Sequence, residues 1–354
     1  MVFHVYTFHY VENLPAAVAF TARMGWMGVD LFFVLSGYLI GSQLLRPYLR
    51  GECPTLWNFY RNRAFRVLPA YGVVLVVYLI LPFWRETPDM SPPWKFLTFT
   101  QNLFADDRVN QAFSHVWSLC VEEHFYLFLP LIVLPMMRKP SFRKTMALLA
   151  GLAILGICIR AFILFQTLQP LARAGKSFGL VYLERIYYPT YSRLDGLLAG
   201  VALALLKTFR PVWWNELARR GHTLLCMGLF FMSVAIFLFK DRWQSVTGAS
   251  AVGTVIGFPL FSLGLGLLVA SALSSNGLLS RFKVPGARLI ATLAYSLYLT
   301  HKELIHLVDR CFPPVARAGI LPWLGVYTIA CLAVAGLLYL CVERPFLILR
   351  DRKA

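Results

Sequence analysis

The sequence predicts an all-α fold, a polytopic bundle of transmembrane helices. Three observations support this prediction: 58% of the 354 residues are hydrophobic, only 14% are charged, and the apolar residues gather into long blocks without polar faces. A soluble domain carries roughly a quarter charged residues, and a spanning helix needs about 20 mainly apolar residues. Only helices or closed barrels satisfy their backbone in lipid. Because the blocks lack the alternation of barrel strands, we expect helices.

About ten helices are expected, separated by charge clusters and by proline or glycine runs. Their ranges are 1–10, 28–45, 70–84, 114–137, 145–165, 191–206, 222–239, 249–273, 289–307 and 321–342. The first range is too short to span, so we interpret it as the second half of a truncated helix. The polar stretch 85–113 contains a Pro-Pro break and is a candidate for a short interfacial helix. We expect one transmembrane domain at 1–346 and a short basic tail at 347–354.

The distribution of the 34 lysines and arginines supports this segmentation. When successive connections are assigned alternately to the two sides of the membrane, one side holds twenty of these residues and the other holds eleven. Lysine and arginine are enriched in cytoplasmic connections. We therefore expect a cytoplasmic C-terminus in a plasma membrane. The net charge of +17 then serves topology and contact with anionic lipid, not nucleic acid.

The seven cysteines are scattered along the chain, mostly inside apolar segments, with no CxxC pair and no spacing typical of zinc ligands. Cysteines in such positions behave as small buried apolar residues. The sequence therefore predicts neither a disulfide framework nor a metal site.

Ionisable side chains inside the predicted helices are candidates for a functional site, because each costs about 3 kcal/mol in lipid unless it is paired or hydrated. His4, with His9 five residues on, is either a buried hydrogen-bonding residue or a general base. Asp30 lies at the outer edge of the second helix, as an interfacial carboxylate or part of a site. Ser36 and Gly37 form a small pair that suits close helix packing.

Two adjacent carboxylates, Glu122 and Glu123, fall inside the predicted helix 114–137 together with His124. Neighbouring positions on a helix point about 100° apart, so only one of the two acids faces a given neighbour. A structural ion pair is one explanation, and we favour a water-filled cavity. Six more ionisable residues indicate a polar interior shared by several helices: Arg160, Arg193, Asp195, His301, Lys302 and Glu303.

Closely spaced arginines precede the third predicted helix, in the stretch 59–69. They act either as a topology signal in contact with lipid or as a clamp for phosphate groups, which arginine binds through two parallel hydrogen bonds.

Five strings, in this order along the chain, resemble the motifs of the acyltransferase-3 family of membrane O-acyltransferases: GVDLFFVLSGYLI, FYRNRAFRVLPAY, WSLCVEEHFYLFLPL, YSRLDGLLAG and YSLYLTH. The resemblance runs over essentially the whole chain. Arg63 and Arg66 stand at the family's arginine positions, and Glu122 stands at its glutamate. The family's first helix carries an arginine and, after a ten-residue gap, a histidine. His4 fits the histidine best, His9 is the alternative, and the arginine position falls before the first residue.

This resemblance implies transfer of an acyl group, usually acetyl, from acetyl-CoA to a hydroxyl of a carbohydrate or glycolipid acceptor, without a metal. His4 would act as general base on that hydroxyl, and Glu122 or Asp30 would orient it. The donor phosphates would lie on the cytoplasmic arginines. The residues expected to bind the substrates are Arg63, Arg66, Trp117, Ser118, Glu123, Tyr126, Arg193, Asp195, Tyr298 and His301.

Two other functions fit the same residues. A transporter or flippase would also place buried charges along a path, although no internal repeat supports this alternative. A non-catalytic membrane partner of glycan-assembly proteins is the third possibility.

Overall fold

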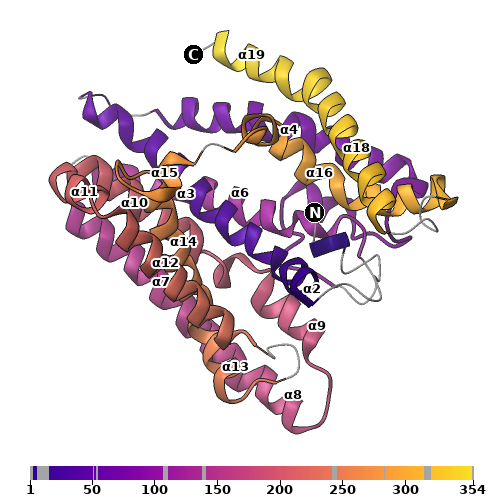
Figure 1. Cartoon of the computed structure of the whole chain (residues 1–354), viewed down its shortest axis with the longest axis horizontal. Helices are drawn as coiled ribbons and strands as arrows, with labels where there is room; N and C mark the ends of the chain where they lie inside the picture. The colour runs from indigo at the N-terminus through magenta and orange to yellow at the C-terminus, as the bar shows by residue number, and fades with distance from the viewer. Residues whose placement is uncertain are drawn as a thin grey trace.

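The computed structural model describes residues 3–5, 16–50, 52, 55–106, 111–137, 141–240, 245–282, 284–314 and 320–352. These residues form helices joined by turns, and the only β-type pairing among them is an isolated bridge between Met90 and Ala112. The predicted all-α fold is therefore confirmed. The helices form two groups, one at the left and lower centre of Figure 1 and one along its top and right.

The first group packs around the pair α3 and α10. Its long helices are α3 (Met27–Leu49), α7 (Phe142–Ile163), α10 (Asp195–Phe209), α12 (Gly221–Leu238) and α14 (Phe258–Ala272). Small residues let the backbones of α3 and α10 come close, because Gly37 lies against Leu197 and Gly200 lies against Val34. Packing through small residues is a common basis of helix association in bilayers.

The second group consists of α4 (Leu56–Ile80), α16 (Ala287–Cys311), α18 (Ile320–Leu338) and α19 (Arg344–Arg352). Helix α6 (Trp117–Met137) joins the two groups. It packs on α3 and α7 of the first group, and Leu119 belongs to an apolar cluster with residues of α4 and α16. Val5 packs in a cluster with residues of α16 and α18, which brings the described part of the N-terminal segment to the second group.

Shorter helices and π-helical turns complete the described chain. The short helices are α2 (Ala16–Arg23), α5 (Pro93–Leu97), α8 (Gln169–Arg173), α9 (Gly179–Tyr182), α11 (Pro211–Ala218), α13 (Gly248–Val252) and α15 (Leu278–Arg281). The π-helical turns are Leu164–Leu168, Leu183–Tyr187, Gly253–Gly257 and Tyr339–Glu343. A π-turn leaves backbone carbonyls outside the regular helical pattern, and such turns are frequent at functional sites.

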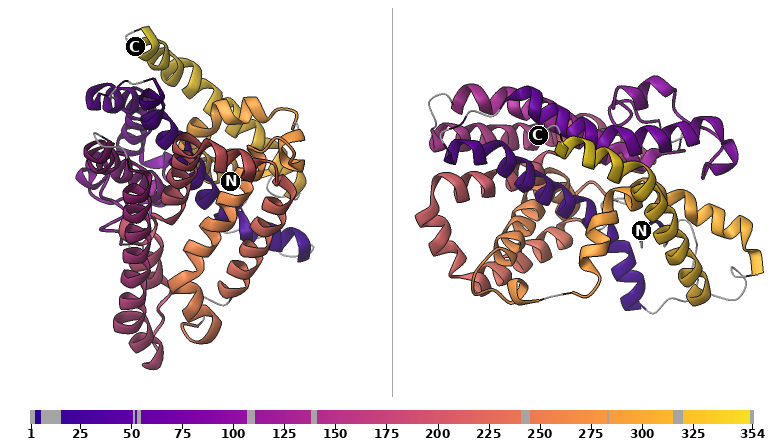
Figure 2. Two further views of the ribbon diagram at one scale, coloured as in Figure 1. Left: turned by 90° about the vertical axis from the view of Figure 1, so that its left-hand side faces the viewer. Right: turned by 90° about the horizontal axis from the view of Figure 1, so that it is seen from above.

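The helices follow the order of the predicted segments, with two differences at their ends. Helix α4 begins at Leu56, so the basic stretch 59–69, expected in a connection, is helical. Arginine is a good helix former, and its long side chain can extend from an apolar face toward water. The predicted tail is also helical, as α19 continues to Arg352 and runs out from α18 toward the C-terminus, as Figures 1 and 2 show.

Six of the described helical stretches are long and apolar enough to cross a membrane, or seven if the bent pair α10 and α11 counts as one span. Helix α16 lies outside this set, and its 25 residues include a row of ionisable side chains. A hydropathy criterion alone therefore misses helices of the bundle whose polar residues face its interior. Of the predicted first helix, residues 3–5 are described, whereas His9 lies outside the described residues.

Candidate functional site

A cavity of about 2230 Å³ is lined by residues from both groups of helices. Small-molecule sites usually measure about 300–1,000 Å³, so this one has room for more than one ligand. Nine of the residues predicted from the sequence line it: His4, Arg63, Arg66, Trp117, Ser118, Glu122, Tyr126, Tyr298 and His301. The structure places the other four predicted residues beside it, outside its lining: Asp30, Glu123, Arg193 and Asp195.

One end of the cavity is basic. Arg63 and Arg66 stand three positions apart on α4, so both project from the same side of the helix. The Nη2 of Arg63 donates to Oε1 of Gln43 at 2.6 Å, and its guanidinium lies 5.0 Å from the ring centre of Tyr126. Two arginines that line one wall provide the donors and charge that a multiply charged anion needs.

The C-terminal helix α19 adds a further arginine to the cavity. The ring centre of Phe346 lies 6.3 Å from that of Phe65, which seats α19 on α4. Arg350 lies one helical turn beyond Phe346 and lines the cavity. Its Nε pairs with Oδ1 of Asp351 at 2.8 Å. Arg352, on the same helix, is exposed and does not line the cavity.

Hydroxyl groups and a carboxyl group line the middle of the cavity. The hydroxyl of Tyr126 donates to Oε1 of Glu122 at 2.9 Å and also contacts the hydroxyl of Ser36. The hydroxyls of Ser118 and Tyr298 lie 2.8 Å apart. These contacts tie α6 to α3 on one side and to α16 on the other.

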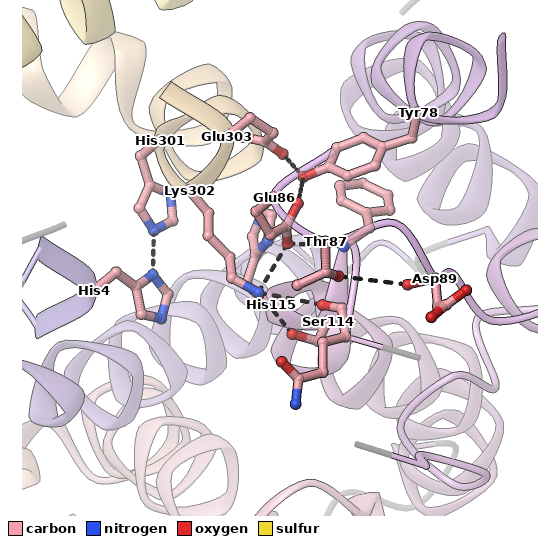
Figure 3. Close-up of polar contacts among 12 residues, drawn as sticks. His4, Tyr78, Glu86, Thr87, Asp89, Ser114, His115, His301, Lys302 and Glu303 are labelled. Carbon is pink, nitrogen blue, oxygen red and sulfur yellow. Dashed lines mark hydrogen bonds and ion pairs between the residues drawn. The ribbon is translucent and has the colours of Figure 1, made fainter. Parts of the chain in front are cut away.

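Two histidines that line the other end of the cavity are His4 and His301. Figure 3 shows that their rings face each other. The Nδ1 of His4 lies 2.8 Å from the Nε2 of His301. The Nδ1 of His301 lies 2.8 Å from the backbone oxygen of Tyr298 and 3.2 Å from that of Leu297. Helix α16 therefore positions His301 through its own preceding turn, and His301 meets a side chain almost 300 positions away in the sequence.

A buried ion pair lies beside these histidines. The Nζ of Lys302 lies 2.8 Å from Oε1 of Glu86 and donates to the hydroxyl of Ser114 at 2.8 Å. The other oxygen of Glu86 accepts from Tyr78 at 3.0 Å, and Tyr78 also contacts Glu303. Figure 3 shows these groups converging from α4, α16 and the segment between α4 and α6. The network anchors that segment to α16, next to the cavity.

Two further buried ion pairs lie outside the cavity lining. Arg160 binds both carboxylate oxygens of Asp195, at 2.8 and 3.2 Å, and its Nε donates to Val255 in the π-turn Gly253–Gly257. Arg193 donates to Asp30 at 3.0 Å. These pairs join α7 to α10 and α3 to the start of α10. Arginine suits the fully buried position of Arg160, where its guanidinium makes several hydrogen bonds.

Sequence reasoning did not assign roles to Glu86, His115 or Arg350, and it treated Ser36 as a packing residue. One signal could have found Glu86. Three lysines or arginines fall inside the predicted helices, and each of them pairs with a buried acid. Lys302 is one of the three, so it required an acidic partner from elsewhere in the chain.

A family model and several known proteins are similar to this chain. Residues 1–342 match the model of a protein family described as an acyltransferase domain. The chain is 26% identical over 316 residues to an O-acetyltransferase OatA of Staphylococcus aureus (strain NCTC 8325 / PS 47), with 81% of this chain and 47% of the relative covered. It is 26% identical over 307 residues to the peptidoglycan O-acetyltransferase OatA of Listeria monocytogenes, with 81% and 46% covered. The chain thus spans about half the length of these relatives. No solved structure matches it.

Proposed function

Since this chain belongs to the acyltransferase family that matches it across residues 1–342, we propose that it is a membrane-embedded O-acyltransferase. It moves an acetyl group from a coenzyme A thioester to a hydroxyl of a carbohydrate or glycan acceptor. The observation that carries the proposal is a single cavity with arginines at one end and a histidine pair at the other. The names of the relatives, O-acetyltransferases and in one case a peptidoglycan O-acetyltransferase, support the acetyl group and the type of acceptor.

The donor binds at the basic end of the cavity. Arg63 and Arg66 contact the phosphate groups of coenzyme A, and Arg350 contributes from α19. The thioester then extends toward the middle of the cavity, where Trp117 and Tyr298 supply apolar and hydroxyl-bearing walls. A thiolate is a good leaving group, so the chain's own residues need to supply a base, orientation and protection from water.

The acceptor hydroxyl binds at the histidine end, where His4 acts as general base. The hydroxyl proton passes to His4, the oxygen bonds to the thioester carbonyl carbon, and the carbon–sulfur bond breaks. The proton on His4 then passes to the departing thiolate, which leaves as coenzyme A. Glu122 orients the reacting groups from the middle of the cavity; it is held by Tyr126, which also contacts Ser36.

Asp30 acts in this proposal through Arg193 and not on the substrate directly. Arg193 lies 3.0 Å from Asp30 and 5.5 Å from the ring centre of Trp117, which lines the cavity. The pair thereby holds Trp117 in place. Asp195 has the same kind of supporting role through Arg160.

The basic end faces the cytoplasm, where the donor is made, and the C-terminus lies on that side. This orientation follows from the twenty lysines and arginines of one set of connections against eleven of the other. The acceptor therefore approaches from the opposite side of the plasma membrane.

Inverted membrane vesicles that contain the protein, supplied with acetyl-labelled coenzyme A, test the proposal. We expect label on a glycan inside the vesicles. In His4→Ala the rate of labelling should fall about 100-fold or more, because general-base catalysis contributes about 10²–10⁴. The control His222→Ala should keep full activity, because its side chain is exposed and outside the cavity. Unchanged labelling in His4→Ala would refute the assigned base. Passage of an unmodified glycolipid across the vesicle membrane, with no transfer of label, would indicate a transporter instead.

A further inference from the structure

The hydrogen bonds around His301 define which of its ring nitrogens carries the proton. A backbone carbonyl oxygen only accepts, so the Nδ1 of His301, 2.8 Å from the carbonyl oxygen of Tyr298, must donate. In a neutral imidazole the other nitrogen then carries the lone pair. His301 therefore presents the lone pair of its Nε2 to its neighbour across the cavity.

That neighbour is His4, whose Nδ1 lies 2.8 Å from the Nε2 of His301. Because Nε2 of His301 accepts, Nδ1 of His4 donates, and the lone pair of a neutral His4 lies on its Nε2. His4 lines the cavity, so this tautomer gives it a basic nitrogen for a ligand there. We infer that His301 is a positioning residue that fixes the tautomer and orientation of His4, the general base of the proposed function on which this inference rests.

Several contacts hold His301 in the orientation that this role requires. Its ring centre lies 5.3 Å from that of His115, at an interplanar angle of 72°. Its backbone oxygen accepts from the hydroxyl of Tyr327 at 2.9 Å. The next residue, Lys302, is anchored to Glu86. His301 itself is 5% exposed, so its ring has little freedom to turn.

The same hydrogen bond serves both protonation states of His4. When His4 takes the acceptor's proton on Nε2, its Nδ1–H continues to donate to His301, whose lone pair now stabilises an imidazolium. When that proton passes to the thiolate, the starting tautomer returns without rotation of either ring. The arrangement resembles the aspartate of serine-protease triads in role, where loss of tautomer control costs about 10⁴ in kcat.

A matched pair of amide substitutions tests the inference in acetyl transfer by the full chain. In His301→Gln the side-chain amide oxygen of the glutamine can reach the position of the histidine Nε2. The shorter asparagine of His301→Asn places its amide atoms near the position of the histidine Nδ1. We expect His301→Gln to keep about a tenth or more of wild-type kcat, and His301→Asn to lose about 100-fold or more, with both KM values within about threefold of wild type. Equal kcat values in the two variants, or an effect confined to the acceptor KM, would overturn the inference.

The double variant His4→Ala/His301→Asn adds a second criterion. Residues that act as one unit show no additional loss when both are removed, so we expect the double variant to match His4→Ala. A further fall of tenfold or more would show that His301 acts separately, for instance on the acceptor. Thermal melts and acetyl-CoA binding of each variant, measured in detergent, confirm that the compared proteins are folded.

Nitrogen NMR of histidine-labelled protein gives a readout that does not depend on turnover. We expect His4 to be protonated on Nδ1 in the wild type and to become a mixture of tautomers in His301→Asn. A wild-type His4 protonated on Nε2 alone would overturn the inference even if acetyl transfer occurs. The expected tautomer in a protein without transfer activity would contradict the proposed function and leave the positioning role of His301 in place.

Discussion

The close backbone contact between α3 and α10 provides a quantitative test of the fold. Gly37 of α3 faces α10, and a Cβ atom added there would lie 2.1 Å from the backbone oxygen of Leu197. Real Cβ contacts do not fall below 3.0 Å, so Gly37→Ala requires the two backbones to separate by about 0.9 Å. The obstructing atom belongs to the backbone, so no side-chain rotation relieves the clash.

This separation has a cost that can be estimated. Overpacking a well-packed interior by one methyl group costs about 1–3 kcal/mol, and we expect the upper part of this range because both contact surfaces are backbone. A loss of this size corresponds to a fall of roughly 3–4 °C in Tm, because an unfolding entropy of about 2.1 cal/mol/K per residue gives about 0.7 kcal/mol/K for 354 residues.

Gly72 of α4 provides the matched control, because an added Cβ there meets nothing within 4 Å. Alanine is the better helix former, so Gly72→Ala should leave the Tm unchanged or raise it. The measurement is a fluorescence-detected thermal melt of both variants and the wild type in one detergent. Equal Tm values for Gly37→Ala and Gly72→Ala would refute the close approach of α3 and α10.

Three further predictions concern buried charge and the donor end of the cavity. Asp195→Asn leaves Arg160 buried without its counter-charge, which should cost about 3–5 kcal/mol and appear as a lower Tm. Arg350→Gln should raise the KM for acetyl-CoA about three- to tenfold because it removes a charged donor, while Arg352→Gln, on the exposed side of the same helix, should not. Glu86→Gln should loosen the segment before α6 and raise the acceptor KM; an unchanged acceptor KM would contradict its anchoring role.

The helical bundle was predictable because its signals are local. Long apolar blocks, and basic residues concentrated in alternate connections, depend only on neighbours in the sequence. The start of α4 was not predictable in this way. Its first residues carry arginines that resemble a connection, and they are helical because their long side chains can leave an apolar helix for water.

The pairing of the ionisable residues could not be derived from the sequence, because it depends on how each helix is rotated and tilted. Asp30 and Glu122 both qualified as intramembrane acids, yet Asp30 pairs with Arg193, whereas Glu122 lines the cavity. Ser36 has two structural roles. It lies beside Gly37 where α3 packs on α10, and its hydroxyl also contacts that of Tyr126 in the cavity. A small residue in a helix motif does not reveal which of these applies.

The histidine pair has a consequence for how the protein is made. His4 and His301 lie 297 positions apart, and a ribosome adds about 5–20 residues per second, so the first histidine waits roughly 15–60 s for the second. Glu86 likewise precedes its partner Lys302 by most of the chain. During this interval the part of the chain already made holds polar groups whose later partners are not yet present. A nascent chain that stalls before α16 would therefore expose polar side chains that lack their partners, a feature that membrane quality control can recognise.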